Sequence, residues 1–92
     1  MYTELAKEGH AKSQFALGNI YKASSNFDEA IKWYKMCAKQ GWVAAVFKIG
    51  ETYQEAGNIE EAIANFKQAA DLGNGKAKLA LKKIKAAANT EM

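Results

Sequence analysis

The sequence repeats itself with a period of 32 residues, and this repeat constrains the fold more than any other feature. A shift by that interval places residues 9–41 on residues 41–73, with glycines, phenylalanines and a Glu-Ala-Ile run in register. The identical positions include Gly9/Gly41/Gly73, Phe15/Phe47, Gly18/Gly50, Tyr21/Tyr53, Asn26/Asn58, Glu29/Glu61, Ala30/Ala62 and Ile31/Ile63. A period of this length is typical of solenoids, in which one supersecondary unit stacks on its copies.

The residues within each repeat favour helices. The chain contains no proline, so nothing forbids helix through its interior. Gly9, Gly41 and Gly73 each follow a helical pattern, at the point where a left-handed residue ends a helix and glycine is preferred. Asn26 and Asn58 precede helices as N-caps, with a glutamate three residues later as the capping-box partner. The sequence therefore predicts an all-α fold, an α-solenoid of antiparallel helix pairs.

We expect one helical-repeat domain over residues 1–92, with about two full repeats. Its parts are a half-helix at 1–9, repeat one at 10–41, repeat two at 42–73 and a capping helix at 74–88. The expected helices cover residues 2–8, 11–23, 27–40, 43–56, 59–72 and 76–87. The last helix is assigned as a cap because Lys82 and Lys85 replace Gly50 and Tyr53 of the repeat. The first half-helix lacks its front, which favours a slice of a longer repeat array or a truncated gene.

The glycines and tryptophans inside the repeats predict particular packing contacts. Gly18 and Gly50 lie in mid-helix, where glycine lowers stability by about 1 kcal/mol relative to alanine. Because both repeats keep the glycine, a neighbouring helix is expected to approach closely there. Trp33 becomes Asn65 in the second repeat, so we expect it either on the convex side or in the gap beside the half-helix. Trp42, in the link between repeats, is expected to pack over the helix ends.

Charge and apolar patterning narrow the class of protein. The net charge is +3, because residues 1–72 carry 8 Lys and 9 acidic residues whereas residues 73–92 carry 5 Lys and one Glu. All 13 basic residues are lysine, and specific phosphate or base recognition usually relies on the planar fork of arginine. A nucleic-acid partner is therefore disfavoured. The longest apolar run, residues 42–47, is too short to cross a membrane, so we expect no membrane partner.

No residue pattern indicates catalysis, a cofactor or a metal. His10 is the only histidine, with no second histidine or cysteine at ligand spacing. The acidic pairs at 28–29 and 60–61 lie in first helical turns, where negative charge is favourable. We therefore expect a non-enzymatic protein without a cofactor. Cys37 is the only cysteine; it precludes an intrachain disulfide, fits a reducing compartment such as the cytoplasm and is expected to be an inert core thiol.

Two stretches resemble known helical repeats. The stretch from Tyr53 to Ala69, YQEAGNIEEAIANFKQA, resembles the tetratricopeptide repeat in the spacing of its tyrosine, glycine, alanine and aromatic residues. The stretch from Ala6 to Tyr21, AKEGHAKSQFALGNIY, is similar to the related Sel-one-like repeat. The period is shorter than the roughly 34 residues of the tetratricopeptide repeat, so the chain looks like a hybrid, closest to the Sel-one-like subfamily.

The resemblance implies a right-handed superhelix whose first helices in each repeat, the A-helices, line a concave groove for peptides or protein surfaces. Some tetratricopeptide domains hold the C-terminal carboxylate of a partner with a lysine–asparagine clamp. Only Asn19 and Lys76 match that clamp in this chain, whereas Phe15, Lys48 and Ala80 depart from it. The expected function is therefore protein or peptide binding in the groove, without the clamp.

The groove candidates are polar and aromatic residues on the non-core face of the two A-helices. They are Lys12, Phe15, Asn19 and Lys22 in repeat one, and Phe47, Glu51, Gln54 and Glu55 in repeat two. Spacings of three and four residues place the first set on one stripe. A different interpretation stays open for Phe15 and Phe47, which would also be explained by packing between successive A-helices.

Two other functions remain open. The first is self-association, as a homodimer through an apolar flank at the incomplete first repeat, formed by Tyr2, Leu5 and Trp33. The second is binding of nucleic acid or an acidic surface by the lysines at 76–85. No aromatic residue lies among these lysines to stack on bases, which weakens the second alternative.

Overall fold

The computed structural model describes residues 2–90, which form six helices and no strand. The helices are α1 (Tyr2–Lys7), α2 (Ala11–Ala23), α3 (Phe27–Ala38), α4 (Val43–Glu55), α5 (Ile59–Asp71) and α6 (Gly75–Thr90). Every predicted helix is present, and the largest difference is the extension of α6 to Thr90. The structure confirms the α-solenoid of antiparallel helix pairs.

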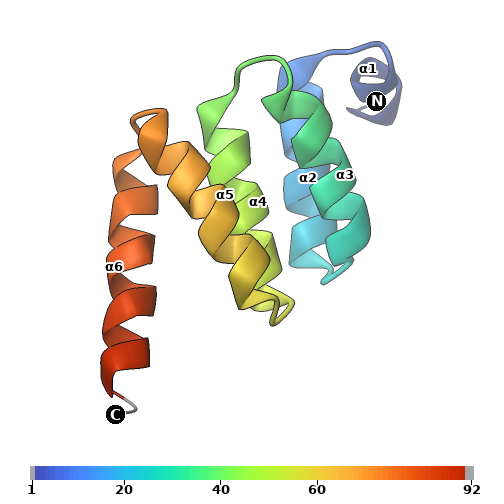
Figure 1. The fold of residues 1–92 in the computed structure, drawn as a ribbon. Coiled ribbons are helices and arrows are strands. Elements are labelled where there is room, and N and C mark those ends of the chain that lie inside the picture. Colours follow the sequence, from blue (N-terminus) through green and yellow to red (C-terminus); the bar gives the residue numbers. More distant parts are fainter. Residues whose placement is uncertain (1, 91–92) are drawn as a thin grey trace.

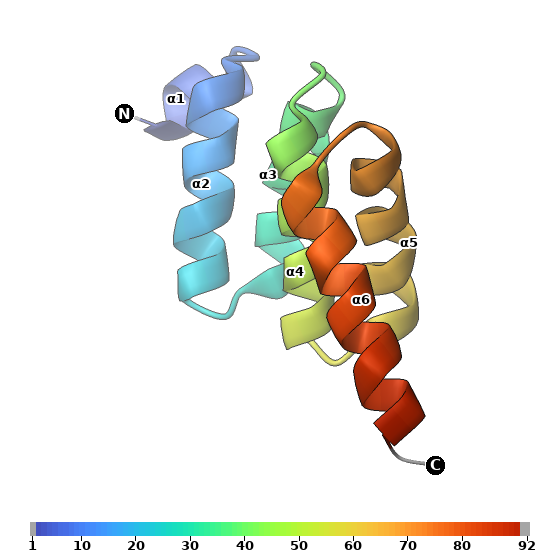
Figure 2. The ribbon, with the colours of Figure 1, turned by 90° about the vertical axis from the view of Figure 1, so that its left-hand side faces the viewer.

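The helices form two layers, and each helix packs on its neighbour in the chain (Figure 1). The pairs α2/α3 and α4/α5 are the two repeats, with α3 and α5 in front of α2 and α4 in Figure 1. Figure 2 views the molecule from the α6 end, with α2 and α5 on opposite sides. The result is an elongated body of 49 × 26 × 15 Å.

The two mid-helix glycines receive aromatic rings from the second helix of their repeats. A Cβ atom added to Gly18 would lie 2.5 Å from Cδ1 of Tyr34, and one added to Gly50 would lie 2.7 Å from Cδ1 of Phe66. Both rings are fully buried. This confirms the predicted close approach, and it shows that the two repeats use the same contact.

Trp33 fills the gap between the half-helix and the first repeat, one of its two predicted positions. Its side chain is 5% exposed and packs with Ala6 and Leu17. The expectation that Trp33 contributes to an uncovered flank is therefore wrong, because α1 covers it. Leu5 remains 42% exposed, and the side chain of Tyr2 lies outside the described residues.

The structure confirms the predicted glycines at the helix ends, but only one of the two predicted asparagine caps. Gly9, Gly41 and Gly73 have φ values of 90°, 91° and 97°, as expected for left-handed helix ends. The Asn58 side chain accepts from the backbone N–H of Glu61 at 3.4 Å. The capping box predicted at Asn26 is wrong in one respect, since that side chain makes no capping hydrogen bond.

Replacing Gly50 with alanine tests the ring-on-glycine contact. The new Cβ would meet the Phe66 ring at 2.7 Å, and such overpacking typically lowers stability by about 1–3 kcal/mol. Gly75→Ala is the control, because a Cβ there meets nothing within 4 Å and alanine is the better helix former. We expect urea denaturation to show a loss for Gly50→Ala and none for Gly75→Ala. Equal or higher stability of Gly50→Ala would contradict the contact.

The turn between α2 and α3 contains a strained residue. Ser25 has φ 62°, and its counterpart in the second repeat is Gly57, with φ 86°. A left-handed conformation costs a non-glycine residue about 1–2 kcal/mol, and a glycine at position 25 would avoid this cost. The greater freedom of glycine in the unfolded chain offsets part of the gain. We expect Ser25→Gly to raise the free energy of unfolding by up to about 1 kcal/mol. Ser24→Gly, at φ −86°, should lower it, and a gain in both variants would refute the strain at Ser25.

Candidate functional site

A groove of about 680 Å³ opens on the side of the A-helices, mainly between α4 and α6. We call it the α4/α6 groove. It is lined by Phe15 from α2, by Ala44, Phe47, Lys48, Glu51 and Gln54 from α4, by Phe66 from α5, and by Asn74, Gly75, Lys76, Leu79, Ala80 and Lys83 at α6. Its size is within the range of ordinary ligand pockets, about 300–1,000 Å³.

An apolar row crosses the α4/α6 groove, formed by Phe15, Phe47 and Leu79. The three residues are separated by one repeat period each, so each A-helix contributes one of them. Both phenylalanines are half-buried; the ring centroid of Phe47 lies 5.5 Å from that of Phe66. Leu79 is 58% exposed. The phenylalanines therefore pack on core rings and still present surface to the groove.

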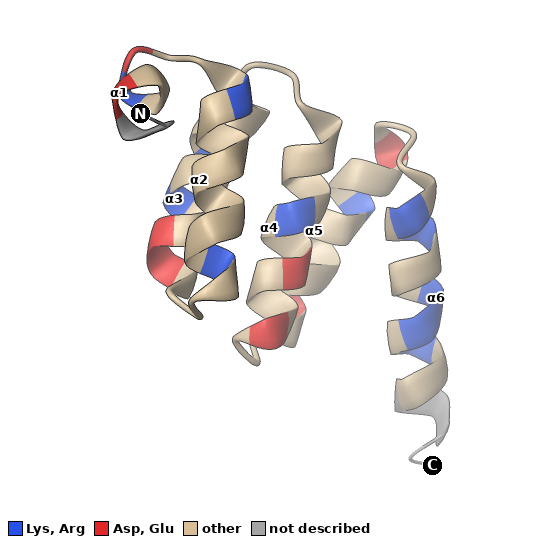
Figure 3. Ribbon diagram, turned by 180° about the vertical axis from the view of Figure 1, so that it is seen from behind, with Lys and Arg blue, Asp and Glu red and all other residues tan. Residues whose placement is uncertain are grey.

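The charged residues of the groove are mostly basic. Lys48 Nζ lies 3.3 Å from Glu51 Oε1, so these two charges offset each other. Lys76 and Lys83 are exposed and make no ion pair with any residue that the structure describes. Figure 3 views the molecule from behind and shows the lysines distributed along α6. The α6 wall therefore carries uncompensated positive charge.

The structure brings four of the eight predicted groove residues to this site. They are Phe15, Phe47, Glu51 and Gln54. The other four, Lys12, Asn19, Lys22 and Glu55, do not line the groove.

Three of the remaining residues have other contacts. Lys22 Nζ and Glu55 Oε2 form an ion pair of 2.5 Å that joins α2 to α4. Asn19 accepts a hydrogen bond from the hydroxyl of Tyr34. Burial raises the pKa of that hydroxyl far above its usual value, and the nearby carboxylates of Glu51 and Glu55 raise it further. The hydroxyl therefore stays protonated and holds Asn19 in place.

Sequence reasoning missed the α6 wall of the groove, although the signal was present. One further shift of 32 residues carries Ala44, Phe47 and Glu51 to positions 76, 79 and 83. Those positions hold Lys76, Leu79 and Lys83, which line the groove. The same period that predicted the repeats therefore also identifies the α6 wall of the groove.

A second groove, of about 380 Å³, lies on the opposite side, between α3 and α5. We call it the α3/α5 groove. Its lining residues are Lys35, Ala38, Lys39, Gly41, Trp42, Val43, Val46, Ile49, Asn65, Gln68 and Leu72. Trp42 lies between the two sites, because it lines this groove while its ring centroid is 5.7 Å from that of Phe15. Trp42 is the N-cap residue of α4, and its packing over the other helix ends stays a prediction.

The reactive side chains of the described residues have structural contacts. His10 precedes α2, and its Nδ1 lies 2.6 Å from Ser13 Oγ. Within residues 2–90, no group of three His, Cys, Asp or Glu side chains could hold a metal ion. Cys37 is fully buried, which raises the pKa of its thiol to about 11. The thiol is thus inert at neutral pH, as predicted.

None of the described helices has both the length and the apolar character required to span a membrane.

The buried thiol predicts a pH effect on stability. The unfolded chain loses the Cys37 proton near pH 9.0, whereas the folded chain keeps it to about pH 11. Between these values the unfolded state binds fewer protons, so the free energy of unfolding falls as pH rises, by at most about 1.4 kcal/mol per pH unit. Cys37→Ala copies Ala69 of the second repeat and removes this contribution. Urea denaturation under reducing conditions should show a steeper decline for the wild type; parallel pH profiles would refute it.

Comparison with known proteins gives matches to family models only. Two models match, each described as "Tetratricopeptide repeat", one over residues 15–40 and the other over residues 43–72. The first segment covers most of α2 and all of α3, and the second covers α4 and α5. No curated protein and no solved structure matches the chain. Neither matched description is Sel-one-like, so that subfamily stays a prediction. Together with the helix pairs, the matches show that the chain belongs to the tetratricopeptide-like helical repeat proteins.

Proposed function

We propose that this protein binds an acidic, partly apolar peptide segment of a partner protein in the α4/α6 groove. Proteins with tetratricopeptide repeats generally mediate protein–protein interactions and are generally non-enzymatic scaffolds. The observation that carries the proposal is the apolar row of the groove, flanked by unpaired lysines on α6. Apolar surface supplies binding energy, and the charge selects the ligand.

The apolar row offers separate contact points for a partner. Leu79 is more than half exposed, and Phe15 and Phe47 are half-buried. Full burial of an exposed leucine or phenylalanine contributes about 1.5–3 kcal/mol, so a ligand that covers the row gains several such contributions. The rings also pack on core residues, which holds them in place before a ligand arrives. Preorganised contacts of this kind lower the entropy lost on binding.

The lysines define the charge and spacing of the ligand. Lys76 and Lys83 are seven residues apart on α6, which corresponds to about 10 Å along a helix. An extended peptide covers that distance in about three residues. We therefore expect two acidic side chains about three residues apart, with a large apolar side chain between them. Attraction between exposed charges weakens as salt is added, so affinity should fall with ionic strength.

The two alternative functions have less support. Self-association through the first repeat would rely on Leu5, because α1 covers Trp33; a monomer in sedimentation at high concentration would exclude it. Binding of nucleic acid would rely on the α6 lysines, without an aromatic residue among them. Absence of a salt-dependent mobility shift with RNA and DNA would exclude this function.

Peptides selected from a random library on the wild-type protein test the groove. We expect the selected peptides to be rich in Asp and Glu with at least one large apolar residue. In fluorescence anisotropy, Lys76→Glu/Lys83→Glu should weaken their binding at least tenfold, because the reversed charges repel acidic side chains. Leu79→Ser should also weaken it, because it removes part of the apolar row.

Two matched variants are the controls. Lys78→Glu/Lys82→Glu changes the net charge of α6 equally but lies outside the groove lining. Ile20→Ser removes an aliphatic side chain that is 50% exposed on α2, also outside the lining. We expect both to bind within twofold of the wild type. Equal losses from the two lysine pairs, or none from Leu79→Ser, would exclude groove binding.

A further inference from the structure

The α3/α5 groove is the counterpart of a space that is filled in the first repeat. Subtracting one period of 32 from its residues Ala38, Ile49 and Asn65 gives Ala6, Leu17 and Trp33. Those three residues form a buried cluster between α1 and α3. The same position along the solenoid is therefore packed in one repeat and open in the next.

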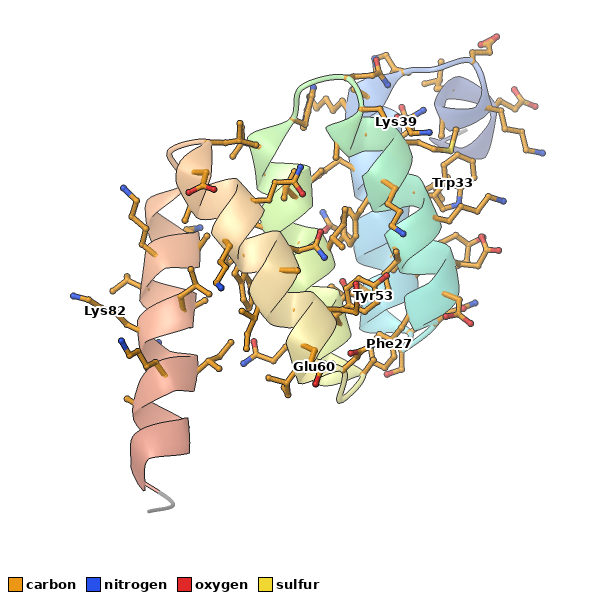
Figure 4. The ribbon with its side chains drawn as sticks, viewed as in Figure 1. Phe27, Trp33, Lys39, Tyr53, Glu60 and Lys82 are labelled. Carbon is orange, nitrogen blue, oxygen red and sulfur yellow. The ribbon has the colours of Figure 1, made fainter. Side chains whose placement is uncertain are left out.

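In the first repeat, the indole of Trp33 closes this space. It is 5% exposed and packs with Ala6 and Leu17, with Met36 against the cluster. Figure 4 shows Trp33 beside α3, on the side that faces α1. The chain itself thus shows that a tryptophan side chain fits in the space between α1 and α3.

In the second repeat, the residues that border the space are similar, but the tryptophan that fills it is absent. Ala38 and Ile49 stand where the first repeat has Ala6 and Leu17. Asn65 replaces the indole, and its Nδ2 donates to the carbonyl of Glu61, one turn back on its own helix, at 2.9 Å. Gln68 replaces Met36. The amide side chain is shorter and bound to its own helix, and the space remains as a groove of about 380 Å³.

The charged residues that line the α3/α5 groove are both lysines. Lys35 and Lys39 line it from the α3 side, and Figure 4 shows Lys39 near the end of that helix. Neither lysine makes an ion pair with a described residue, and no acidic residue is among the lining residues. Electrostatic complementarity therefore favours a ligand with carboxylates beside its apolar group.

We propose that the α3/α5 groove is a second protein-binding site, which accepts a tryptophan side chain from an acidic segment of a partner protein. The indole of the partner lies against Ala38 and Ile49, in the space of the second repeat that corresponds to the one filled by Trp33 in the first. Carboxylates next to it pair with Lys35 and Lys39. This site is on the opposite side from the α4/α6 groove and does not depend on it.

A short peptide tests the site directly. The probe is a fluorescein-labelled peptide with one tryptophan between two pairs of glutamates, and its matched control has alanine in place of the tryptophan. We expect anisotropy to show at least tenfold tighter binding of the tryptophan peptide. No measurable binding of it at millimolar protein, or equal binding of the two peptides, would overturn the proposal.

A variant that fills the groove from within is the sharpest test. Asn65→Trp/Gln68→Met copies Trp33 and Met36 of the first repeat, so the chain's own indole should occupy the site. We expect at least a tenfold loss of probe binding with a midpoint of thermal unfolding equal to or above that of the wild type. Asn65→Ala keeps the groove open and should bind within threefold. Unchanged binding by the filled variant would overturn the proposal.

Two further measurements locate the bound peptide on the molecule. Leu79→Ser alters only the α4/α6 groove, so a loss of probe binding in that variant would place the peptide there and overturn the proposal.

Titration of ¹⁵N-labelled wild type with N-acetyltryptophanamide should shift the side-chain amide signals of Asn65 and Gln68. This readout holds even if the filled variant does not fold; shifts confined to other residues would overturn the proposal. A concentration-dependent dimer that competes with the probe would identify a second copy as the occupant and would overturn the proposal.

Discussion

The contact between an aromatic ring and a mid-helix glycine determines the geometry of the rest of this protein. Tyr34 on Gly18 and Phe66 on Gly50 are the same contact made twice. Each brings the two helices of a repeat so close that a single added Cβ atom would collide with the ring. Because protein interiors are close-packed and deform little, this contact fixes the separation of the helices and the face that each helix turns outward.

The grooves follow from that fixed geometry. With the inner faces of the helix pairs set, the remaining faces of α2, α4 and α6 carry the apolar row of Phe15, Phe47 and Leu79. The other layer, α3 and α5, leaves a second opening where Asn65 replaces a tryptophan. The helix pairs thus act as a rigid support, and the proposed binding depends on which side chains occupy the repeated outward positions.

The sequence predicted the fold well because its main determinants are local and periodic. Glycines at the helix ends and the interval of 32 residues indicated the helices, their order and the close contacts at Gly18 and Gly50. Prediction failed at a cap, because the residue type at a helix start does not by itself determine whether its side chain reaches the backbone N–H groups of the first turn. Asn26 has the sequence of a capping residue but makes no capping hydrogen bond.

The candidate sites were less predictable, because a groove is defined by what neighbouring helices leave uncovered. Leu79 belongs to a helix that the sequence predicts as a cap, so its place in the apolar row was not predicted although the period leads to it. The α3/α5 groove depends on a missing indole, and a gap of this kind is visible only when the residues around it are placed in space.

Nuclear magnetic resonance of the folded protein tests the ring-on-glycine contact most directly. If the Tyr34 and Phe66 rings lie over Gly18 and Gly50, ring currents will displace the Hα signals of both glycines upfield. Each glycine will also show nuclear Overhauser contacts to its ring, while Gly75 shows neither effect. Unshifted Hα signals at Gly18 and Gly50, or contacts from only one of the two rings, would contradict the account of two equal repeats built on one contact.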